Sequence, residues 1–325
     1  MSRPFPLSVL PSSRARPASA VTPRRVMVIA NPAAGTLKGR RLNKALLALE
    51  REGCWVSLRE TTKPGDATLI AQEARRDSLD VVVAAGGDGT INEVANGLAG
   101  SGVALGIIPL GTANVLAIEA GIPRDPAKAA RIIATGQPRE LYMGEVKASA
   151  ETPLGGPRRF VMMAGAGFDA HVVDTVDLAL KRRSGKFAYV WRTLQSALTY
   201  RFPTVSVDVE RPDGEILHRE VATAVVCNGK YYGGPFIAAP AANISHPTFQ
   251  VVLLPRPGLG NVARYSFALA LGRLPHLPDV EILEARRISV RMQGAEPLQA
   301  DGDTVAHMPV DIAMAPKPVH LIVPG

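Results

Sequence analysis

A regular alternation of short apolar runs and helix-like segments in the first 140 residues is the feature that most constrains the fold. Apolar runs occur at 25–30, 55–58, 80–85 and 105–108, and each is followed by a segment with helical spacing. Strands that alternate with helices form a parallel sheet with helices on both faces. We therefore predict an α/β, Rossmann-like domain over 25–140.

Each of these runs ends in a polar turn, and the four turns begin at Asn31, Thr61, Gly86 and Pro109. Parallel strands end at a common edge of their sheet, and ligands of such sheets bind beyond that edge. We therefore expect the four turns to converge on one ligand site.

The turn after the third run is rich in glycine and reads GGDGTINEVANG from Gly86 to Gly97. Such a turn lets phosphate groups approach backbone N–H groups closely. A carboxylate among these amides, here Asp88, requires a metal ion or a proton to transfer, and Asn92 and Glu93 lie at the far end of the turn. The turn therefore predicts nucleotide-dependent chemistry, with phosphoryl transfer favoured. The sequence has neither GxxxxGK[ST] nor GxGxxG at the first strand, which argues against a P-loop enzyme and a dinucleotide oxidoreductase.

The pattern of apolar runs in the sequence changes after about residue 141. Short apolar runs separated by turns predict a mainly antiparallel, β-rich domain over 141–309. Helical segments at 187–200 and 261–274 interrupt it, and the second is either core or the lining of an acyl-chain groove. Residues 1–24 are rich in proline, serine and arginine and lack acidic residues, so we expect a disordered tail. The expected strands are 160–163, 204–209, 222–226, 250–254, 288–291 and 319–323.

Composition restricts the compartment and the partners. The net charge of +8 suits either approach to anionic lipids and phosphates or a general arginine-rich bias. Aromatic residues make up only 5% and no basic recognition helix occurs, so we expect no nucleic-acid partner. Cys54 and Cys227 are distant in sequence, which indicates a reducing compartment. No apolar run approaches the ~20 residues of a membrane span, so we expect a cytoplasmic protein.

Three of the turns carry motifs in a fixed order. They read Asn31-Pro32…Gly35, then Gly86-Gly87-Asp88-Gly89-Thr90, then Pro109-Leu110-Gly111-Thr112-Ala113-Asn114. With these motifs the chain resembles the diacylglycerol kinase catalytic-domain family, which includes sphingosine, ceramide and bacterial lipid kinases, with NAD kinases more distant. The resemblance covers about 25–323. The downstream motifs that match are Gly165-Ala166-Gly167-Phe168-Asp169, Asn228-Gly229…Tyr232-Gly233-Gly234, Ala239-Pro240-Ala241-Ala242 and Asp301-Gly302-Asp303.

The resemblance implies a nucleotide domain and a β-sandwich domain with the active site in the cleft between them. It also implies that the last segment, about 310–325, returns to the first domain. ATP and Mg²⁺ are the implied cofactors, Asp303 the proton acceptor, and Asp169 a candidate to hold the lipid head group. The positions expected to bind the nucleotide are Asn31, Pro32, Gly35, Thr61, Gly86, Gly87, Asp88, Gly89, Thr90, Asn92, Glu93, Gly111, Thr112 and Asn114.

Three carboxylates from distant parts of the chain, Asp88, Asp301 and Asp303, are the candidate catalytic residues. Brought to one cleft, they would repel one another unless a divalent cation or protons sat among them. Phosphoryl transfer depends mostly on positioning, on charge neutralisation by Mg²⁺ and on a base near the attacking hydroxyl. We therefore predict Asp88 and Asp301 as metal ligands. The alternative for Asp301-Gly302-Asp303 is a plain turn.

Departures from the family pattern bear on the substrate. Diacylglycerol kinases of this family usually carry an aspartate directly after the GTxN motif, where this chain has Val115. Sphingoid-base and ceramide kinases often have a non-acidic residue there, so this position favours a substrate of that kind or an undefined lipid. Bacterial diacylglycerol kinases also tend to carry an acidic turn linked to a structural Mg²⁺, where this chain reads ISHPTF at 244–249. We therefore do not expect that structural metal. Asp303 is one methylene shorter than the glutamate often found at its position.

The leading hypothesis is an ATP- and Mg²⁺-dependent lipid kinase that phosphorylates a hydroxyl of a sphingoid base, a ceramide or a diacylglycerol. It would meet this membrane lipid by transient contact with the membrane surface, as a peripheral cytoplasmic enzyme. The alternatives are a kinase of a soluble substrate that resembles NAD kinase and a non-catalytic nucleotide- or lipid-binding regulator. The sequence leaves the identity of the lipid and the oligomeric state open.

Overall fold

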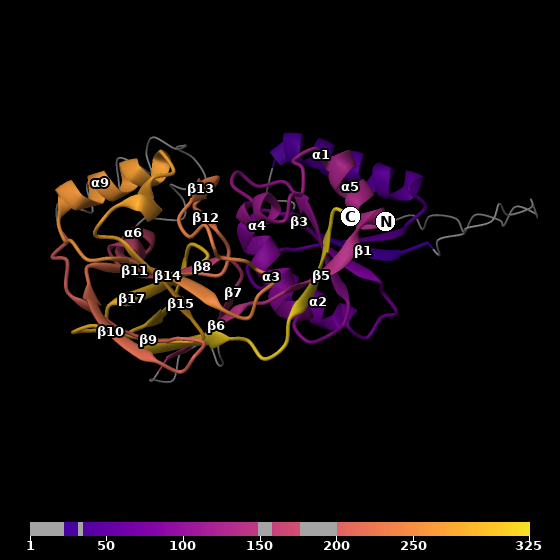
Figure 1. Cartoon of the computed structure of the whole chain (residues 1–325). Coiled ribbons are helices and arrows are strands. Elements are labelled where there is room, and N and C mark those ends of the chain that lie inside the picture. The colour runs from indigo at the N-terminus through magenta and orange to yellow at the C-terminus, as the bar shows by residue number, and fades with distance from the viewer. Residues whose placement is uncertain (1–22, 32–34, 149–157, 176–199) are drawn as a thin grey trace, which may run out of the picture.

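The computed structural model describes residues 23–31, 35–148, 158–175 and 200–325. They form an α/β domain and a β-sandwich that lie side by side (Figure 1). The predicted fold class, a Rossmann-like domain followed by a mainly antiparallel sandwich, is confirmed.

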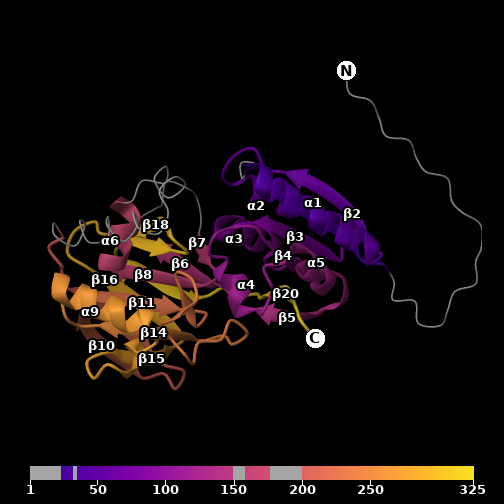
Figure 2. The same ribbon diagram turned by 90° about the horizontal axis from the view of Figure 1, so that it is seen from above.

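The first domain is a six-stranded sheet covered by helices on both faces. Its elements are β1 Arg25–Ala30, α1 Gly35–Arg51, β2 Trp55–Glu60, α2 Asp66–Ala74, β3 Val81–Gly86, α3 Asp88–Leu98, β4 Ala104–Pro109, α4 Val115–Glu119, α5 Pro126–Thr135, β5 Gln137–Leu141 and β20 Val319–Val323. The strand order is β2-β1-β3-β4-β20-β5, and only β5 runs antiparallel to its neighbour. Helices α1 and α5 pack on one face and α2 and α3 on the other (Figure 2). Strand β3 is therefore buried along its whole length.

The register of the parallel strands brings the polar turns together. Ala30, the last residue of β1, lies opposite Glu60 of β2 and Ala85 of β3. Gly86 lies opposite Pro109 at the end of β4. The four turns therefore leave the sheet at one edge, as the alternation of strands and helices predicts.

The second domain consists of two antiparallel six-stranded sheets that enclose an apolar core. The sheets have the orders β10-β9-β16-β19-β6-β7 and β15-β14-β11-β8-β17-β18, and β12 and β13 pair with each other as a separate two-stranded sheet. Phe160 and Phe249 stack inside the core with ring centroids 5.9 Å apart. The strands are β6 Gly144–Ala148, β7 Arg158–Phe160, β8 Met163–Gly167, β9 Val205–Glu210, β10 Ile216–Val221, β11 Thr223–Cys227, β12 Tyr231–Tyr232, β13 Phe236–Ile237, β14 Phe249–Leu254, β15 Glu281–Ala285, β16 Arg287–Arg291, β17 Pro297–Ala300, β18 Asp303–His307 and β19 Val310–Met314.

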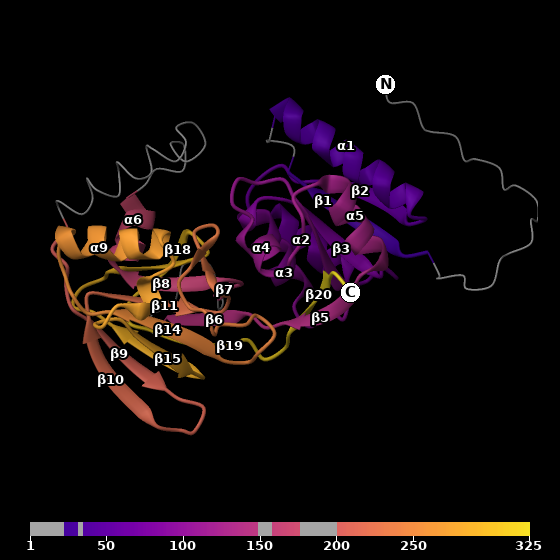
Figure 3. The same cartoon turned by 45° about the horizontal axis from the view of Figure 1, so that its top comes forward.

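Two described helices lie against the second sheet, α6 Phe168–Thr175 and α9 Leu259–Ala270 (Figure 3). The second of these was expected over 261–274, but it ends earlier. Gly272 adopts a left-handed backbone with φ 67°, which terminates the helix, and a short 3-10 turn follows at Leu274–His276.

The chain crosses between the domains twice, and the second crossing falls later than expected. Val310–Met314 pairs with β6 and β16, so it belongs to the sandwich rather than to a return that begins at 310. Only β20 returns, and it enters the first sheet between β4 and β5. The single expected strand at 160–163 is two strands, because β7 ends at Phe160 and β8 begins at Met163.

Two further expectations concern the N-terminal tail and the helix at 187–200. Residues 1–22 of the expected tail and nearly all of the helix expected at 187–200 lie outside the described residues. Arg24, placed in the tail by its sequence, is anchored, since its guanidinium donates to the carbonyl oxygens of Ile133 at 2.6 Å and Gly136 at 2.7 Å. None of the helices in the described part of the chain combines the length and the apolar character that crossing a membrane requires.

Candidate active site

Two glycine-containing turns cross in backbone contact at the carboxyl edge of the first sheet. The carbonyl oxygen of Gly86 accepts hydrogen bonds from the N–H groups of Leu110 at 2.9 Å and Gly111 at 3.0 Å. A Cβ atom at Gly111 would lie only 2.5 Å from the Cα atom of Gly87. Any side chain at Gly111 would therefore separate the two turns.

The Asp88 carboxylate links the glycine turn after β3 to the start of α4. Its Oδ2 accepts the backbone N–H of Asn114 at 2.9 Å, and its Oδ1 accepts that of Val115 at 2.6 Å. Asn114 is buried with a left-handed φ of 51° and donates its side-chain amide to the Gly86 oxygen at 2.9 Å. Asp88 is thus a joint between the two turns as well as a carboxylate at the predicted nucleotide site.

The N-terminus of α3 is open to a ligand. Its first helical hydrogen bond runs from the Ile91 N–H to the Gly87 oxygen at 3.1 Å, so the N–H groups of Asp88, Gly89 and Thr90 have no acceptor within the helix. A Cβ atom at Gly89 would meet no atom within 4 Å. Free N–H groups, the helix dipole and open space are what a polyphosphate chain requires.

The other expected nucleotide residues lie around this opening. Asn31 is exposed directly after β1, and Thr112 is exposed in the turn after β4. Thr61 is buried, and its hydroxyl lies 3.5 Å from the Ala30 carbonyl oxygen at the end of β1. Its side chain therefore contacts the sheet edge. Gly35 is the first residue of α1, and Pro32 lies outside the described residues.

Asn92 and Glu93 occupy structural positions instead of the nucleotide-binding positions expected for them. The Glu93 carboxylate accepts the Ala67 N–H at the start of α2 at 3.2 Å. The Asn92 amide donates to Asp301 Oδ2 at 2.6 Å, which links the first domain to the second. Both side chains are thus held by partners from other elements of the structure.

Asp301 is the centre of the contact between the domains. Besides Asn92, the N–H groups of Val161, Met162 and Met163 donate to its two oxygens at 2.6, 2.9 and 3.1 Å. A carboxylate offers about four acceptor positions, and these four donors use them. The predicted metal-ligand role of Asp301 is therefore not supported. Burial raises the pKa of this carboxyl, although the four hydrogen bonds act in the opposite direction.

Asp303 lies two residues further on but is exposed, as the first residue of β18. Among the described residues, no group of three or more histidine, cysteine, aspartate or glutamate side chains is arranged to hold a metal ion. The expected cluster of Asp88, Asp301 and Asp303 is thus not assembled, because Asp88 and Asp301 are turned toward backbone N–H groups. Of the three, only Asp303 has its carboxylate directed to solvent.

Asp169 forms a partly buried polar network that ends at the turn carrying Asp303. Tyr232 donates its hydroxyl to Asp169 Oδ1, and the Gln299 amide donates to Asp169 Oδ2 at 2.7 Å. The Gln299 oxygen in turn accepts the Gly302 N–H at 2.9 Å. Burial is the main cause that raises the pKa of Asp169, and the two side-chain hydrogen bonds oppose it.

Tyr232 and Gln299 were missed by sequence reasoning. Gln299 is 2% exposed and lies between the buried residues Leu298 and Ala300 of β17. A polar side chain inside an otherwise apolar strand is the signal that could have identified it, since buried polar groups need partners. Tyr232 belonged to a recognised motif but had been assigned no role.

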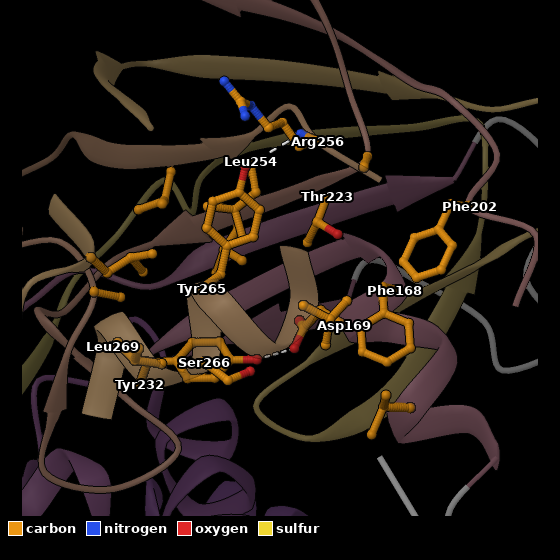
Figure 4. Close-up of a pocket in the computed structure, with 17 residues that line it drawn as sticks. Phe168, Asp169, Phe202, Thr223, Tyr232, Leu254, Arg256, Tyr265, Ser266 and Leu269 are labelled. Carbon is orange, nitrogen blue, oxygen red and sulfur yellow. Dashed lines mark hydrogen bonds between the residues drawn. The ribbon is translucent and has the colours of Figure 1, made fainter. Parts of the chain in front are cut away.

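An apolar pocket of about 190 Å³ lies in the second domain with Asp169 and Tyr232 on its wall (Figure 4). Helix α9 contributes Val262, Tyr265 and Leu269 to the lining. The helix expected at 261–274 is therefore both core and pocket wall. The remaining lining residues are Phe168, Val172, Phe202, Ala222, Thr223, Val225, Ala238, Val252, Leu254, Arg256, Ser266 and Leu274.

Comparison with known proteins covers nearly the whole chain. Residues 25–146 match the diacylglycerol kinase catalytic domain, and residues 162–323 match the YegS C-terminal NAD kinase beta sandwich-like domain. A diacylglycerol kinase of Bacillus subtilis is 31% identical over 93% of this chain and 97% of its own length. One from Staphylococcus carnosus is 25% identical over 93% and 95%. A crystal structure of a diacylglycerol kinase from Bacillus anthracis shares the fold, with a TM-score of 0.71 at 24% identity over 92% of this chain and 97% of that one.

Substitution of Asp301 should destabilise the protein. Asp301→Ala removes the acceptor of four N–H donors, and we expect the free energy of unfolding, measured in urea, to fall by about 3 kcal/mol or more. The matched control is Asp303→Ala, which removes an exposed carboxylate two residues away and should change stability by no more than about 0.5 kcal/mol. Equal losses in the two variants would contradict the role of Asp301 as the joint.

The raised pKa of Asp169 predicts a defined pH dependence of stability. The folded protein binds this proton more tightly than the unfolded chain, so the favourable contribution is complete below the unfolded pKa of about 3.9 and is lost as the pH rises through the raised value. We expect the Tm of the wild type, relative to that of Asp169→Asn, to rise as the pH is lowered from neutral toward the unfolded pKa. A difference in Tm that is constant with pH would show that Asp169 does not titrate in the fold.

Proposed function

The chain belongs to the diacylglycerol kinase catalytic-domain family and is a lipid kinase, and from this premise we propose that it transfers the γ-phosphoryl group of ATP, together with Mg²⁺, to the hydroxyl of diacylglycerol. One observation carries the proposal. Helix α3 starts at the open glycine turn, and four residues later its Asn92 bonds Asp301, two residues before Asp303. Four helical residues rise about 6 Å. A phosphate chain on the turn and the exposed carboxylate of Asp303 would therefore belong to one site.

The described residues fit a nucleotide phosphate chain. The N–H groups of Asp88, Gly89 and Thr90 and the open space above Gly89 would hold its anionic oxygens. Mg²⁺ is commonly bound through one or two carboxylates together with substrate phosphates, so a preformed cluster of carboxylates is not required. When bound, the ion would neutralise charge on the transferred group. Asp88 would hold the ion, since each of its oxygens accepts only one N–H, and would also fix the turn beneath the phosphates.

The acceptor hydroxyl would be activated by Asp303. This carboxylate takes the hydroxyl proton as the oxygen attacks the γ-phosphorus, and ADP leaves with the electron pair of the broken P–O bond. The network from Asp169 through Gln299 to the Gly302 N–H holds the Asp303 turn in place. A fixed turn serves catalysis because small displacements of a catalytic group cost large factors in rate.

The apolar pocket would receive part of the lipid. Its lining is mostly apolar, and two of its polar residues, Asp169 and Tyr232, lie on the network that leads to Asp303. We propose that an acyl chain enters the pocket while the polar head group lies toward Asp169. This arrangement favours a lipid over a soluble substrate such as NAD.

A sphingoid base or a ceramide is the second candidate acceptor. Val115 stands where diacylglycerol kinases of this family usually carry an aspartate, and its side chain is buried. Position 115 therefore offers no carboxylate to the site. The candidates are separated by an assay with labelled ATP, Mg²⁺ and vesicles that contain diacylglycerol, ceramide or a sphingoid base. One labelled lipid product would identify the substrate, and labelling of none would overturn the proposal.

Asp303→Asn should abolish most of this activity without loss of stability. We expect kcat to fall by about 10²–10⁴-fold, as for removal of a general base, while the urea midpoint stays that of the wild type, because the side chain is exposed. Asp77→Asn is the control, since Asp77 is also exposed but lies before β3, at the far edge of the sheet. Wild-type kcat in Asp303→Asn would remove Asp303 from the mechanism.

Filling the pocket should affect long lipids selectively. Leu269→Trp places a larger side chain into the cavity from α9, and we expect kcat/KM for a long-chain diacylglycerol to fall about tenfold or more. Activity on a short-chain diacylglycerol and the affinity for ATP should remain near wild type. Equal losses for long and short chains would show that the pocket does not hold the acyl chain.

A further inference from the structure

Helix α9 presents an outward face without a charged residue. The exposed positions on this helix and its C-cap are Gly260, Ala263, Ser266, Phe267, Ala270 and Leu271. Phe267 is 68% exposed and Leu271 57% exposed. These six positions fall on one side of the helix at its periodicity of 3.6 residues per turn. A helix face in contact with water usually carries charged side chains, so this face is unusual for a water-exposed surface.

The opposite face of the same helix closes the apolar pocket. Tyr265 and Ala268 are buried, and Val262 and Leu269 line the cavity. Ser266 and Arg256 line the pocket and are also exposed, so the pocket opens beside the outward face. The route into the pocket and the uncharged face therefore lie next to each other.

Positive charge borders this face. No acidic residue occurs between Gln250 and Asp279, whereas Arg256, Arg264 and Arg273 lie in this interval. Asp279 pairs with Arg256 at 3.2 Å and also with Arg264. Arg273 is exposed and forms no ion pair with any described residue. Three arginines against one aspartate leave a net positive rim around an apolar centre.

We propose that the outward face of α9 docks on a lipid bilayer that contains anionic lipids. Phe267 and Leu271 enter the boundary between head groups and acyl chains, and the arginines, Arg273 foremost, contact the anionic head groups. This inference rests on the proposed function, because docking in this orientation sets the mouth of the pocket on the membrane that supplies the lipid. The outward face of α9 is thus the surface of the molecule that meets the membrane.

A bilayer fits this face better than a second copy of the chain does. Stable protein interfaces take roughly 20–30 residues from each side, and the uncharged face has far fewer. A symmetric dimer through α9 would also bring the two arginine rims together, with repulsion between like charges. An anionic bilayer has the opposite charge and no minimum contact area.

The test uses the full-length double variant Phe267→Ser/Leu271→Ser in a flotation assay. The vesicles consist of phosphatidylcholine alone or of phosphatidylcholine with phosphatidylglycerol. We expect the double variant to bind the mixed vesicles at least about tenfold more weakly than the wild type, because it loses two inserting side chains. Ile216→Ser is the matched control, since Ile216 is 67% exposed on β10, at the far end of the same domain from α9 (Figure 3). This control should bind as the wild type does.

A second variant tests the charged rim. Arg273→Gln should weaken binding to the mixed vesicles about fivefold and leave binding to phosphatidylcholine alone unchanged. Salt should reduce the effect of this substitution, because it screens exposed charges. An equal loss on both kinds of vesicle would overturn the electrostatic part of the proposal.

Turnover of a water-soluble short-chain diacylglycerol separates failure of the docking surface from failure of the proposed function. Docking is supported if the double variant keeps wild-type turnover of this substrate while it loses vesicle binding. Wild-type vesicle binding by the double variant would overturn the docking surface, whatever the turnover. Dissociation of a dimer in the double variant, seen by light scattering, would overturn it in favour of a contact between two copies. No turnover by the wild type would overturn the proposed function alone.

Discussion

The architecture depends on one partly buried carboxylate. Asp301 leaves the sandwich sheet in a left-handed conformation with φ 49° and receives hydrogen bonds from Asn92 in the first domain and from the backbone between β7 and β8. It therefore joins three segments that are far apart in sequence. Because an unpaired buried carboxylate is costly, the bond is maintained only while all donors stay in place. This requirement fixes the position of α3 relative to the sandwich.

The same turn also positions the exposed carboxylate. Gln299 holds one side of it by accepting the Gly302 N–H and donating to Asp169, and Asp301 holds the other. Asp303 thus projects into solvent from a turn that is fixed on both sides. The proposed role of Asp303 as proton acceptor needs this combination, since the carboxylate must be free to meet a substrate while its backbone does not move. The structural role of Asp301 and the proposed catalytic role of Asp303 thus fall to two aspartates that only one glycine separates.

The sequence was sufficient for the framework but insufficient for this division of roles. The apolar run at Val81–Gly86 predicted β3, and its glycine turn predicted the strand-to-helix turn at the edge of the sheet, because local periodicity and turn chemistry determine them. Asp301 and Asp303 could not be told apart, since their difference arises from tertiary contacts with Asn92 and with the backbone after β7. Asn92 and Glu93 were misjudged for the same reason. They follow the predicted phosphate-binding turn in the sequence, yet their partners belong to other elements.

The order in which the first sheet is completed has a consequence for synthesis of the chain. Strand β20 lies between β4 and β5, although it follows the entire sandwich in the sequence. As the polypeptide leaves the ribosome, the first domain emerges with a gap in its sheet that only a much later segment can fill. The edges of β4 and β5 that pair with β20 stay unpaired until the sandwich has been synthesised. The first domain to be synthesised is therefore among the last parts of the molecule to be finished.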